Sequence, residues 1–349
     1  MPNEDRNTTT VVSVSNQRDG VTTTTAFSSG FNLNALRRHP AGNILIIFTL
    51  LEIACVIAAI LYPDRFHYLS PLNIQSVLRA IPQLGIIAVG VGILMIAGEY
   101  DLSVGATFTL SALTMANTFD AGLPLVLAVA AGLVTGLVIG AINGLVTLKA
   151  RIPSFITTLG MMMLLRGVIL FSSGTQTRPF HPGLAFETLM TGSIGLVQAS
   201  FLWLLVITFA AYLLMDRHRL GNHIYAIGGN REAATSIGVR VSQVKLLAFI
   251  IAGGAAALSG IISTVRVSSV SPIQGQGLEL QAIAACVIGG VSLYGGKGSM
   301  IGVFLGAALL YNIQDILLLL RAPGFYLDAF IGAIILVAAT LNRLIQKEP

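Results

Sequence analysis

The residues of this sequence best suited to chemistry are polar side chains that interrupt long apolar runs. The segment GEYDLSVG at residues 98–105 places Glu99 and Asp101 in an otherwise apolar stretch. Carboxylates accept hydrogen bonds from hydroxyl groups, so these acids could bind a polyol. Two interpretations are open: a short turn whose acids lie in water, or a helix break whose acids and freed backbone groups face a permeation path. For the second interpretation the predicted path residues are Glu99, Asp101, Ser103 and Ser292.

A second segment, IGGNREAATSIGV at residues 227–239, predicts a short helix between two apolar runs. Asn230 is a suitable N-cap residue, and Glu232 falls in the first turn, where a negative charge is stabilised. Gly238 is placed to end the helix after about two turns. Because so short a helix is not stable alone, we expect it to dock on another surface. An ordinary amphipathic connector is the alternative.

The sequence offers no catalytic or metal-binding set. Its five histidines lie in tails or connections, and Cys55 and Cys286 lie in apolar runs without C-x-x-C spacing or nearby histidines. The glycine-rich segment GGVSLYGGKGS at 289–299 does not fit the phosphate-binding pattern G-x-x-x-x-G-K-[ST]. We therefore predict no catalytic residue, no metal ligand and no cofactor bound by this chain, and we expect that it is not an enzyme.

Composition indicates an all-α polytopic membrane protein. Of the 349 residues, 54% are hydrophobic and 10% are charged, against roughly 25% charged residues in soluble domains. So few charges could not cover the surface of a soluble fold. Apolar runs of about 20 residues predict ten transmembrane helices, of which 72–97 and 279–295 could be broken or re-entrant. The ten predicted spans are 44–62, 72–97, 103–119, 123–148, 154–172, 196–215, 244–265, 279–295, 299–320 and 327–343.

The distribution of basic residues predicts the orientation. Most of the 20 Lys and Arg residues fall in the N-terminal tail and in alternate connections, which places these segments and both termini in the cytoplasm. We expect residues 1–40 to form a disordered cytoplasmic tail, because they are rich in Thr and Ser and lack a helical period. Residues 41–345 then form one transmembrane domain, with an outer loop at 173–195 and an inner loop at 216–243. This distribution accounts for the net charge of +5 without a nucleic-acid partner.

Further polar residues lie inside predicted spans, where ionisable side chains usually face a cavity or a partner. For each of them, a hydrogen bond between helices and a contact with solute both remain open. They are Glu52, Gln75, Arg79, Asn143, Arg166, Asn312, Gln314 and Asp315. Glycines at 132, 136, 140 and 144 predict a different feature, a continuous face for close helix packing.

Three segments, in order along the chain, resemble those of a known family. EAATSIG at 232–238 is similar to the E-A-A-x-x-x-G loop of ATP-binding cassette (ABC) importer permeases. GEYDLSVG resembles the G-x-x-D-L-S-V-G signature of the ribose/xylose/galactose-type permeases. IGGVSLYGGKGSMIGVFLGA at 288–307 is similar to a further segment of the same group, and the likeness extends over residues 70–345.

The resemblance implies a transmembrane permease subunit of a sugar importer in a bacterial inner membrane. The loop at 216–243 would dock on a separate cytoplasmic ATPase, which binds the ATP, and the periplasmic loop at 173–195 would face a sugar-binding protein. A second permease copy, identical or related, would complete the assembly in the lipid bilayer. The coupling residues that the resemblance implies are Gly228, Gly229, Asn230, Glu232, Ala233, Ala234 and Gly238.

Two alternatives remain open. An ion-gradient-driven secondary transporter would need no ATPase, and Glu52, Glu99 and Asp315 would be its proton sites. An ABC permease of the same type could instead carry a branched-chain amino acid or a nucleoside. The sequence does not define the solute further.

Overall fold

The computed structural model describes residues 42–323, 326, 329–333, 336–337 and 340. The tail predicted for residues 1–40 lies outside the described residues, and the span predicted at 327–343 falls partly outside them.

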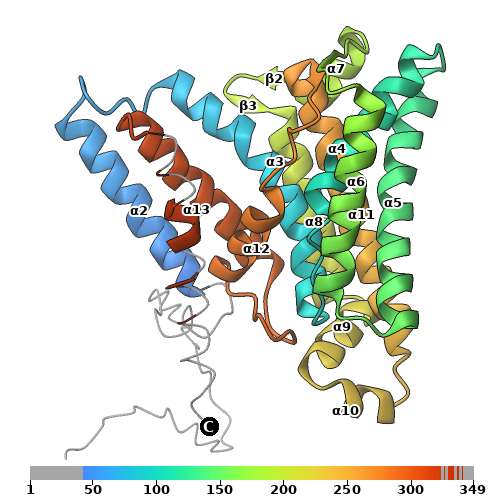
Figure 1. The fold of residues 1–349 in the computed structure, drawn as a ribbon. Helices are drawn as coiled ribbons and strands as arrows, with labels where there is room; N and C mark the ends of the chain where they lie inside the picture. Colours follow the sequence, from blue (N-terminus) through green and yellow to red (C-terminus); the bar gives the residue numbers. More distant parts are fainter. Residues whose placement is uncertain (1–41, 324–325, 327–328, 334–335, 338–339, 341–349) are drawn as a thin grey trace, which may run out of the picture.

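The described residues fold almost entirely into α-helices (Figure 1). The longer helices are α2 (Gly42–Leu61), α3 (Pro71–Ile96), α4 (Val104–Asp120), α5 (Leu125–Ala150), α6 (Ser154–Ser173), α8 (Ala199–Asp216), α11 (Val241–Val267) and α13 (Met300–Leu319). The shorter helices are α7 (Leu184–Thr191), α9 (Arg219–Gly229), α10 (Arg231–Ser236) and α12 (Leu278–Ile288).

Strands are confined, within the described residues, to four pieces of two residues each. They are β1 (Arg178–Pro179), β2 (Ser193–Ile194), β3 (Val197–Gln198) and β4 (Ser269–Val270). β1 pairs antiparallel with β4, and β2 pairs antiparallel with β3. The first pair joins the connection after α6 to the end of α11.

Seven of the described helices are long and apolar enough to cross a membrane: α2, α3, α5, α6, α8, α11 and α13. They coincide with seven of the ten predicted spans, which confirms an all-α polytopic chain but not the count of ten. α4 occupies the predicted span at 103–119 with 17 residues. α12 covers only the first part of 279–295, because its 11 residues end before Gly289 and Gly290. α3 is continuous in spite of Pro82, so of the two irregular spans only 279–295 is broken.

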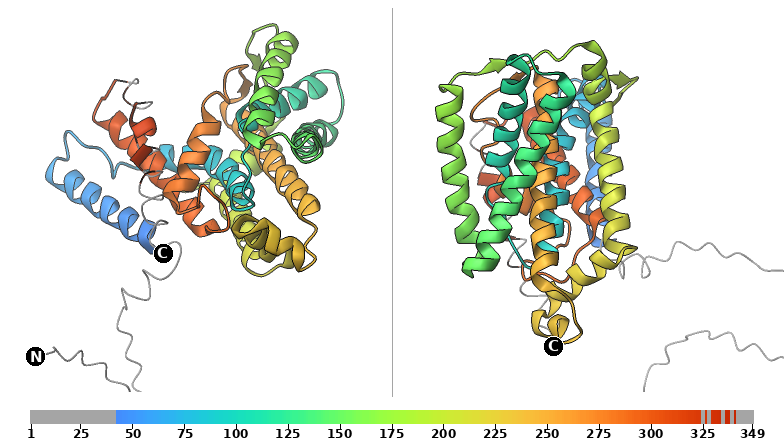
Figure 2. Two further views of the ribbon diagram at one scale, coloured as in Figure 1. Left: turned by 60° about the horizontal axis from the view of Figure 1, so that its bottom comes forward. Right: turned by 90° about the vertical axis from the view of Figure 1, so that its right-hand side faces the viewer.

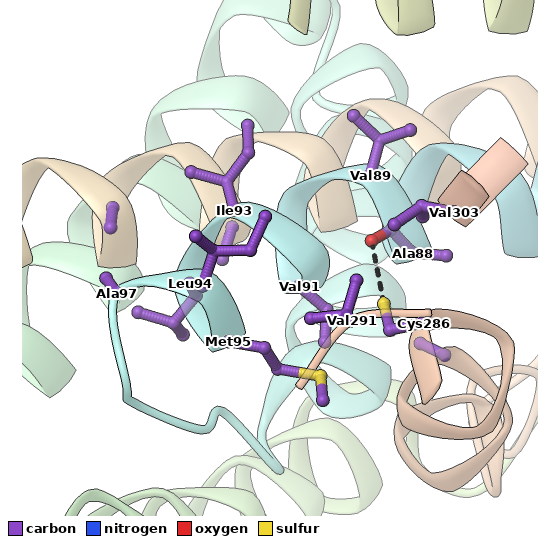
Figure 3. Close-up of a cluster of buried hydrophobic side chains, with 14 of the residues drawn as sticks. Ala88, Val89, Val91, Ile93, Leu94, Met95, Ala97, Cys286, Val291 and Val303 are labelled. Atoms are coloured by element: carbon purple, nitrogen blue, oxygen red, sulfur yellow. Dashed lines mark hydrogen bonds between the residues drawn. The ribbon is translucent and has the colours of Figure 1, made fainter. Parts of the chain in front are cut away.

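Two central helices organise the bundle. In the most apolar 18-residue stretch of each helix, 72% of the residues are buried in α3 and 61% in α11, compared with 17% in α2. α11 packs against α3, α4 and α5, while α13 and α12 cover another side of α3. Figure 3 shows the core between α3 and α12, where the thiol of Cys286 donates a hydrogen bond to the carbonyl oxygen of Ala88 over 3.2 Å.

The outer surface of the bundle is apolar. Phe171 on α6 is 90% exposed and Val126 on α5 is 78% exposed. A soluble monomer rarely exposes such extensive apolar surface, whereas lipid tails cover it at no cost. The buried centre and apolar outside are therefore those of a chain that lies in a bilayer.

Small residues let the helices approach closely, as the glycine spacing predicted. A Cβ atom on Gly136 or Gly140 of α5 would overlap backbone oxygens of α11, those of Gly253 and Phe249 respectively. A Cβ on Gly132 would lie 2.8 Å from the carbonyl oxygen of Ser111 on α4. The predicted packing face is confirmed, because only glycine fits at these contacts.

The two longest connections lie at opposite ends of the bundle. α7 and the β2–β3 pair are at one end, and α9 and α10 extend from the other (Figures 1 and 2). The loops predicted at 173–195 and 216–243 are thus separated by the length of the spanning helices.

Candidate functional site: a capped surface helix beside two chain breaks

The predicted short helix of the 227–239 segment is confirmed as α10. The side-chain oxygen of Asn230 accepts a hydrogen bond from the backbone N–H of Ala233 over 3.0 Å, which caps the first turn. Gly238 ends the helix with a φ of +86°, in the left-handed region that favours glycine. The N–H of Val239 then donates to the carbonyl of Ala234 over 3.1 Å. Local signals at both ends therefore fix these six residues as a helix.

α10 is fixed by one face and presents the other outward. Ala234 is 2% exposed and Val239 is 8% exposed, so both anchor the segment to the bundle. Glu232 and Ala233 lie on the exposed side. Ile237, which sequence reasoning did not single out, is 77% exposed at the end of the helix. Glu232, Ala233 and Ile237 are therefore accessible from outside the bundle.

α9 joins this helix to the bundle by a backbone contact. A Cβ atom on Gly228 would overlap the carbonyl oxygen of Ile96 and the N–H of Gly296. These two groups are themselves hydrogen-bonded, because the N–H of Gly296 donates to the carbonyl of Ile96 over 2.9 Å. The Cβ direction of Gly229, by contrast, is open. Of the two predicted coupling glycines, only Gly228 therefore has its Cβ direction toward the bundle, although the backbone of Gly229 also lies against Gly296.

Tyr225 adds a side-chain contact on the same side of α9. Its hydroxyl donates a hydrogen bond to the carbonyl of Gly298 over 3.0 Å. Burial, with a smaller contribution from the negative charge of Asp216, raises the pKa of Tyr225 to about 12. The hydroxyl therefore keeps its proton and remains a donor at neutral pH.

Glu99, a predicted path residue, is paired with a cation. Its Oε1 lies 2.6 Å from the Nζ of Lys245 on α11, and the two side chains are 14% and 8% exposed. Tyr100 follows it, and its hydroxyl donates to the carbonyl of Leu293. The pair explains how both charges are held in an apolar surrounding.

Asp101 and Ser103 form a buried network with Asn143 of α5. Asp101 Oδ1 accepts hydrogen bonds from the N–H and the hydroxyl of Ser103 over 2.7 and 2.6 Å. Its Oδ2 accepts from the Nδ2 of Asn143 over 3.2 Å. All three residues are at most 1% exposed. The network fixes the break between α3 and α4 to α5, and a role of Asp101 or Ser103 in the path stays a prediction.

Ser292, the fourth predicted path residue, lies in the non-helical segment after α12. It is 3% exposed, its N–H donates to the carbonyl of Lys297 over 2.9 Å, and its Oγ accepts from the N–H of Tyr294 over 3.2 Å. The structure thus places the four predicted residues on two chain breaks, at 97–103 and 289–299. These breaks meet where Gly295 packs against Gly98.

One buried acid was not singled out from the sequence. Glu279 lies in the first turn of α12, and its Oε1 lies 2.8 Å from the Nη2 of Arg166 on α6. Its Oε2 is buried without a hydrogen-bond partner. The signal that could have identified it is an acid two residues after Gly277, in the first turn of a helix, where the helix dipole stabilises negative charge.

A further polar cluster joins α2, α3 and α13. Glu52 accepts hydrogen bonds from Asn312 over 2.6 Å and from the hydroxyl of Tyr68 over 2.9 Å. Asp315 accepts from the Nδ2 of Asn73 over 2.8 Å. Residues predicted as proton sites of a secondary transporter therefore hold helices together here. Among the residues that could be placed, no group of three or more His, Cys, Asp or Glu side chains could bind a metal ion.

Comparison with known proteins shows that most of this chain is similar to permease proteins of transport systems. The family described as branched-chain amino acid transport system / permease component matches residues 73–339. The ribose import permease protein RbsC of Haemophilus influenzae is 36% identical over 86% of this chain and 93% of that protein. RbsC of Escherichia coli K12 is 35% identical over 77% and 84%. The autoinducer 2 import system permease protein LsrC of Salmonella choleraesuis is 34% identical over 82% of each chain. No solved structure matches.

Proposed function

Because the chain belongs to the family of branched-chain amino acid transport system permease components, we propose that it is the multi-pass permease of an ABC sugar importer driven by a separate ATPase. The relatives at 34–36% identity are named for import of ribose and of autoinducer 2, and they favour a sugar over a branched-chain amino acid or a nucleoside. They are permease subunits rather than enzymes, which fits a chain that moves solute and leaves ATP hydrolysis to its partner.

The observation that carries the proposal is the position of α10. A short helix, capped at both ends and exposed on one face, extends beyond the spanning helices at one end of the bundle (Figure 1). Such a helix gains stability by docking. We assign the surface of Glu232, Ala233 and Ile237 to the cytoplasmic ATPase, which places this end of the bundle in the cytoplasm.

The opposite end suits a soluble sugar-binding protein. Leu184 on α7 and Ile194 on β2 are each 80% exposed there. Exposed apolar side chains on a water-facing surface are typical of a protein-binding site. The periplasmic loop at 173–195 is therefore the proposed docking surface for the binding protein.

A second permease copy is proposed for the side where α12 begins. The non-helical segment before α12 lies part-way along the bundle (Figure 1), and Ile273 is 61% exposed and Leu280 is 53% exposed. Non-helical backbone at membrane depth must be covered by protein or line a water-filled path. A second copy, identical or related, would cover this side, and the sugar would pass between the two copies.

The experiment is co-purification followed by transport in proteoliposomes. The chain is co-expressed with a candidate ABC ATPase subunit from the same organism and purified in detergent. Glu232→Lys is expected to lower ATPase recovery strongly, whereas Asp120→Lys, at the opposite end, is expected to leave it unchanged. ATP-dependent sugar uptake by the full assembly would support the proposal. Uptake by this chain alone, abolished by a protonophore and independent of ATP, would replace it with the secondary transporter.

A further inference from the structure

We propose that three glycines, Gly98, Gly228 and Gly295, form a rigid junction through which the coupling helix moves both chain breaks together. This inference rests on the proposed function, because it concerns how movement of α10 reaches the spanning helices. The junction lies where the end of α3, the end of α9 and the segment after α12 meet.

The junction is a contact of backbone with backbone. A Cβ atom built on Gly295 would lie 3.0 Å from the Cα of Gly98 and 3.1 Å from the Cα of Gly228. Gly228 has no space for a Cβ against Ile96 and Gly296. Contacts without side chains have no rotamers that could absorb a displacement, so they transmit movement as a unit.

Three side-chain contacts brace the junction. Tyr225 of α9 is bonded to the carbonyl of Gly298, beyond the junction along the second break. Tyr100 of the first break is bonded to the carbonyl of Leu293 in the second. The pair of Glu99 and Lys245 joins the first break to α11. α9, both breaks and α11 are therefore connected around one point.

The two breaks have the same local geometry. After α3, the N–H of Gly98 donates to the carbonyl of Met95 and that of Glu99 to the carbonyl of Leu94. After α12, the N–H of Gly290 donates to the carbonyl of Val287 and that of Val291 to the carbonyl of Cys286. Gly98 and Gly290 have φ values of +79° and +86°. Both helices thus end in the same glycine-dependent cap, and both caps lead directly into the junction.

The consequence is simultaneous movement of two helices that reach different depths. α3 runs from the junction along the full bundle, and 72% of the residues in its most apolar 18-residue stretch are buried. α12 runs from the junction only to Glu279 and its partner Arg166. A displacement of α10 would act on α9 and then on both helices, so the ends of α3 and of α12 would move in one step.

The decisive variant is Gly228→Ala, with Gly160→Ala as its control. Both glycines lie in helices without a positive φ, but a Cβ overlaps neighbouring backbone at Gly228 and meets nothing at Gly160. In the reconstituted assembly with ATPase and binding protein, Gly228→Ala is compared with the wild type per molecule of ATPase recovered with the chain. We expect it to lose roughly tenfold or more of the sugar-stimulated hydrolysis and uptake. Gly160→Ala is expected to match the wild type.

The ion pair provides a second test that does not depend on how Gly228→Ala folds. Glu99→Gln and Lys245→Gln are each expected to lower stimulated uptake, and the exchanged pair Glu99→Lys with Lys245→Glu to restore it in part. Wild-type stimulation in Gly228→Ala, or full stimulation in both single variants, would overturn the junction. If no ATPase is recovered with the wild-type chain, the proposed function fails. If the ATPase binds the wild-type chain and the variants transport sugar as well as the wild type, the junction alone is wrong.

Discussion

The close approach of α3 and α11 gives a prediction whose size follows from the structure. A Cβ atom on Gly90 of α3 would lie 2.6 Å from the Cβ of Ala255 and 3.1 Å from the Cα of Ala252 on α11. Ordinary contact begins at 3.4 Å, so Gly90→Ala lacks about 0.8 Å of space. Neither facing atom can rotate away, because both are fixed to the backbone. The two central helices must therefore move apart.

The expected change in stability combines two opposing effects. Replacing a helix glycine with alanine stabilises by roughly 0.5–1 kcal/mol, because the unfolded chain loses freedom. Overpacking costs typically about 1–3 kcal/mol, and the upper part of that range applies where no side chain can yield. Gly90→Ala should thus lower the free energy of unfolding by about 2 kcal/mol. Gly167→Ala on α6, whose Cβ meets nothing, should raise it by roughly 0.5–1 kcal/mol.

A third variant makes the series graded. A Cβ on Gly254 of α11 would lie 2.9 Å from the Cδ2 of Leu137, the movable end of a flexible side chain. Gly254→Ala should therefore fall between the other two variants. Thermal unfolding of the purified protein in detergent is the assay, and about 3 kcal/mol between the extremes corresponds to roughly 6–12 °C. Equal midpoints for Gly90→Ala and Gly167→Ala would refute the close contact between the central helices.

Three other substitutions test the local structure. Asn230→Ala removes the cap of α10 and should cost about 1 kcal/mol of local stability, seen as faster amide hydrogen exchange at residues 231–236; unchanged exchange would mean that docking against the bundle alone holds the helix. Asp101→Ala leaves the bonding groups of Ser103 and Asn143 without their acceptor and should cost roughly 3 kcal/mol or more, measured by thermal unfolding; a variant as stable as the wild type would show that the network contributes nothing. Arg166→Met leaves Glu279 buried without its cation and should lower the free energy of unfolding by about 3–5 kcal/mol. Adding Glu279→Leu should recover most of this loss in thermal unfolding; if it recovers none, Arg166 stabilises the fold by contacts other than Glu279.

Local features of the fold were predictable from the sequence. The apolar runs that became α2, α5 and α11 are long enough that hydropathy alone identifies them. α10 was predictable because its start and stop depend on two residues, Asn230 and Gly238, which act through their own backbone. The end of α12 is different. The apolar sequence continues to Val291, and hydropathy carried the predicted span on to 295, but Gly289 and Gly290 end the helix after Ile288.

The partners of the candidate site residues were not predictable, because they depend on contacts distant in sequence. Glu99 is bound to a lysine 146 residues further along the chain, and Asp101 to an asparagine 42 residues away. Neither separation in sequence produces a periodic pattern that could identify the partner. Glu279 was missed because a single acid at the start of an apolar run is typical of any helix N-terminus. Only the three-dimensional fold, which brings Glu279 within reach of Arg166 on α6, shows that it is buried beside a cation.

The burial of both thiols has a practical consequence. Cys55 is 6% exposed and Cys286 is 0% exposed, and the sequence contains no other cysteine. A maleimide or nitroxide reagent needs an accessible thiolate, so the native protein should react with it slowly. A cysteine introduced at the exposed position of Asp120, outside the proposed partner surfaces, could then carry a spectroscopic probe without removal of the two native ones, and its distance to a second label would report movement between the two labelled positions.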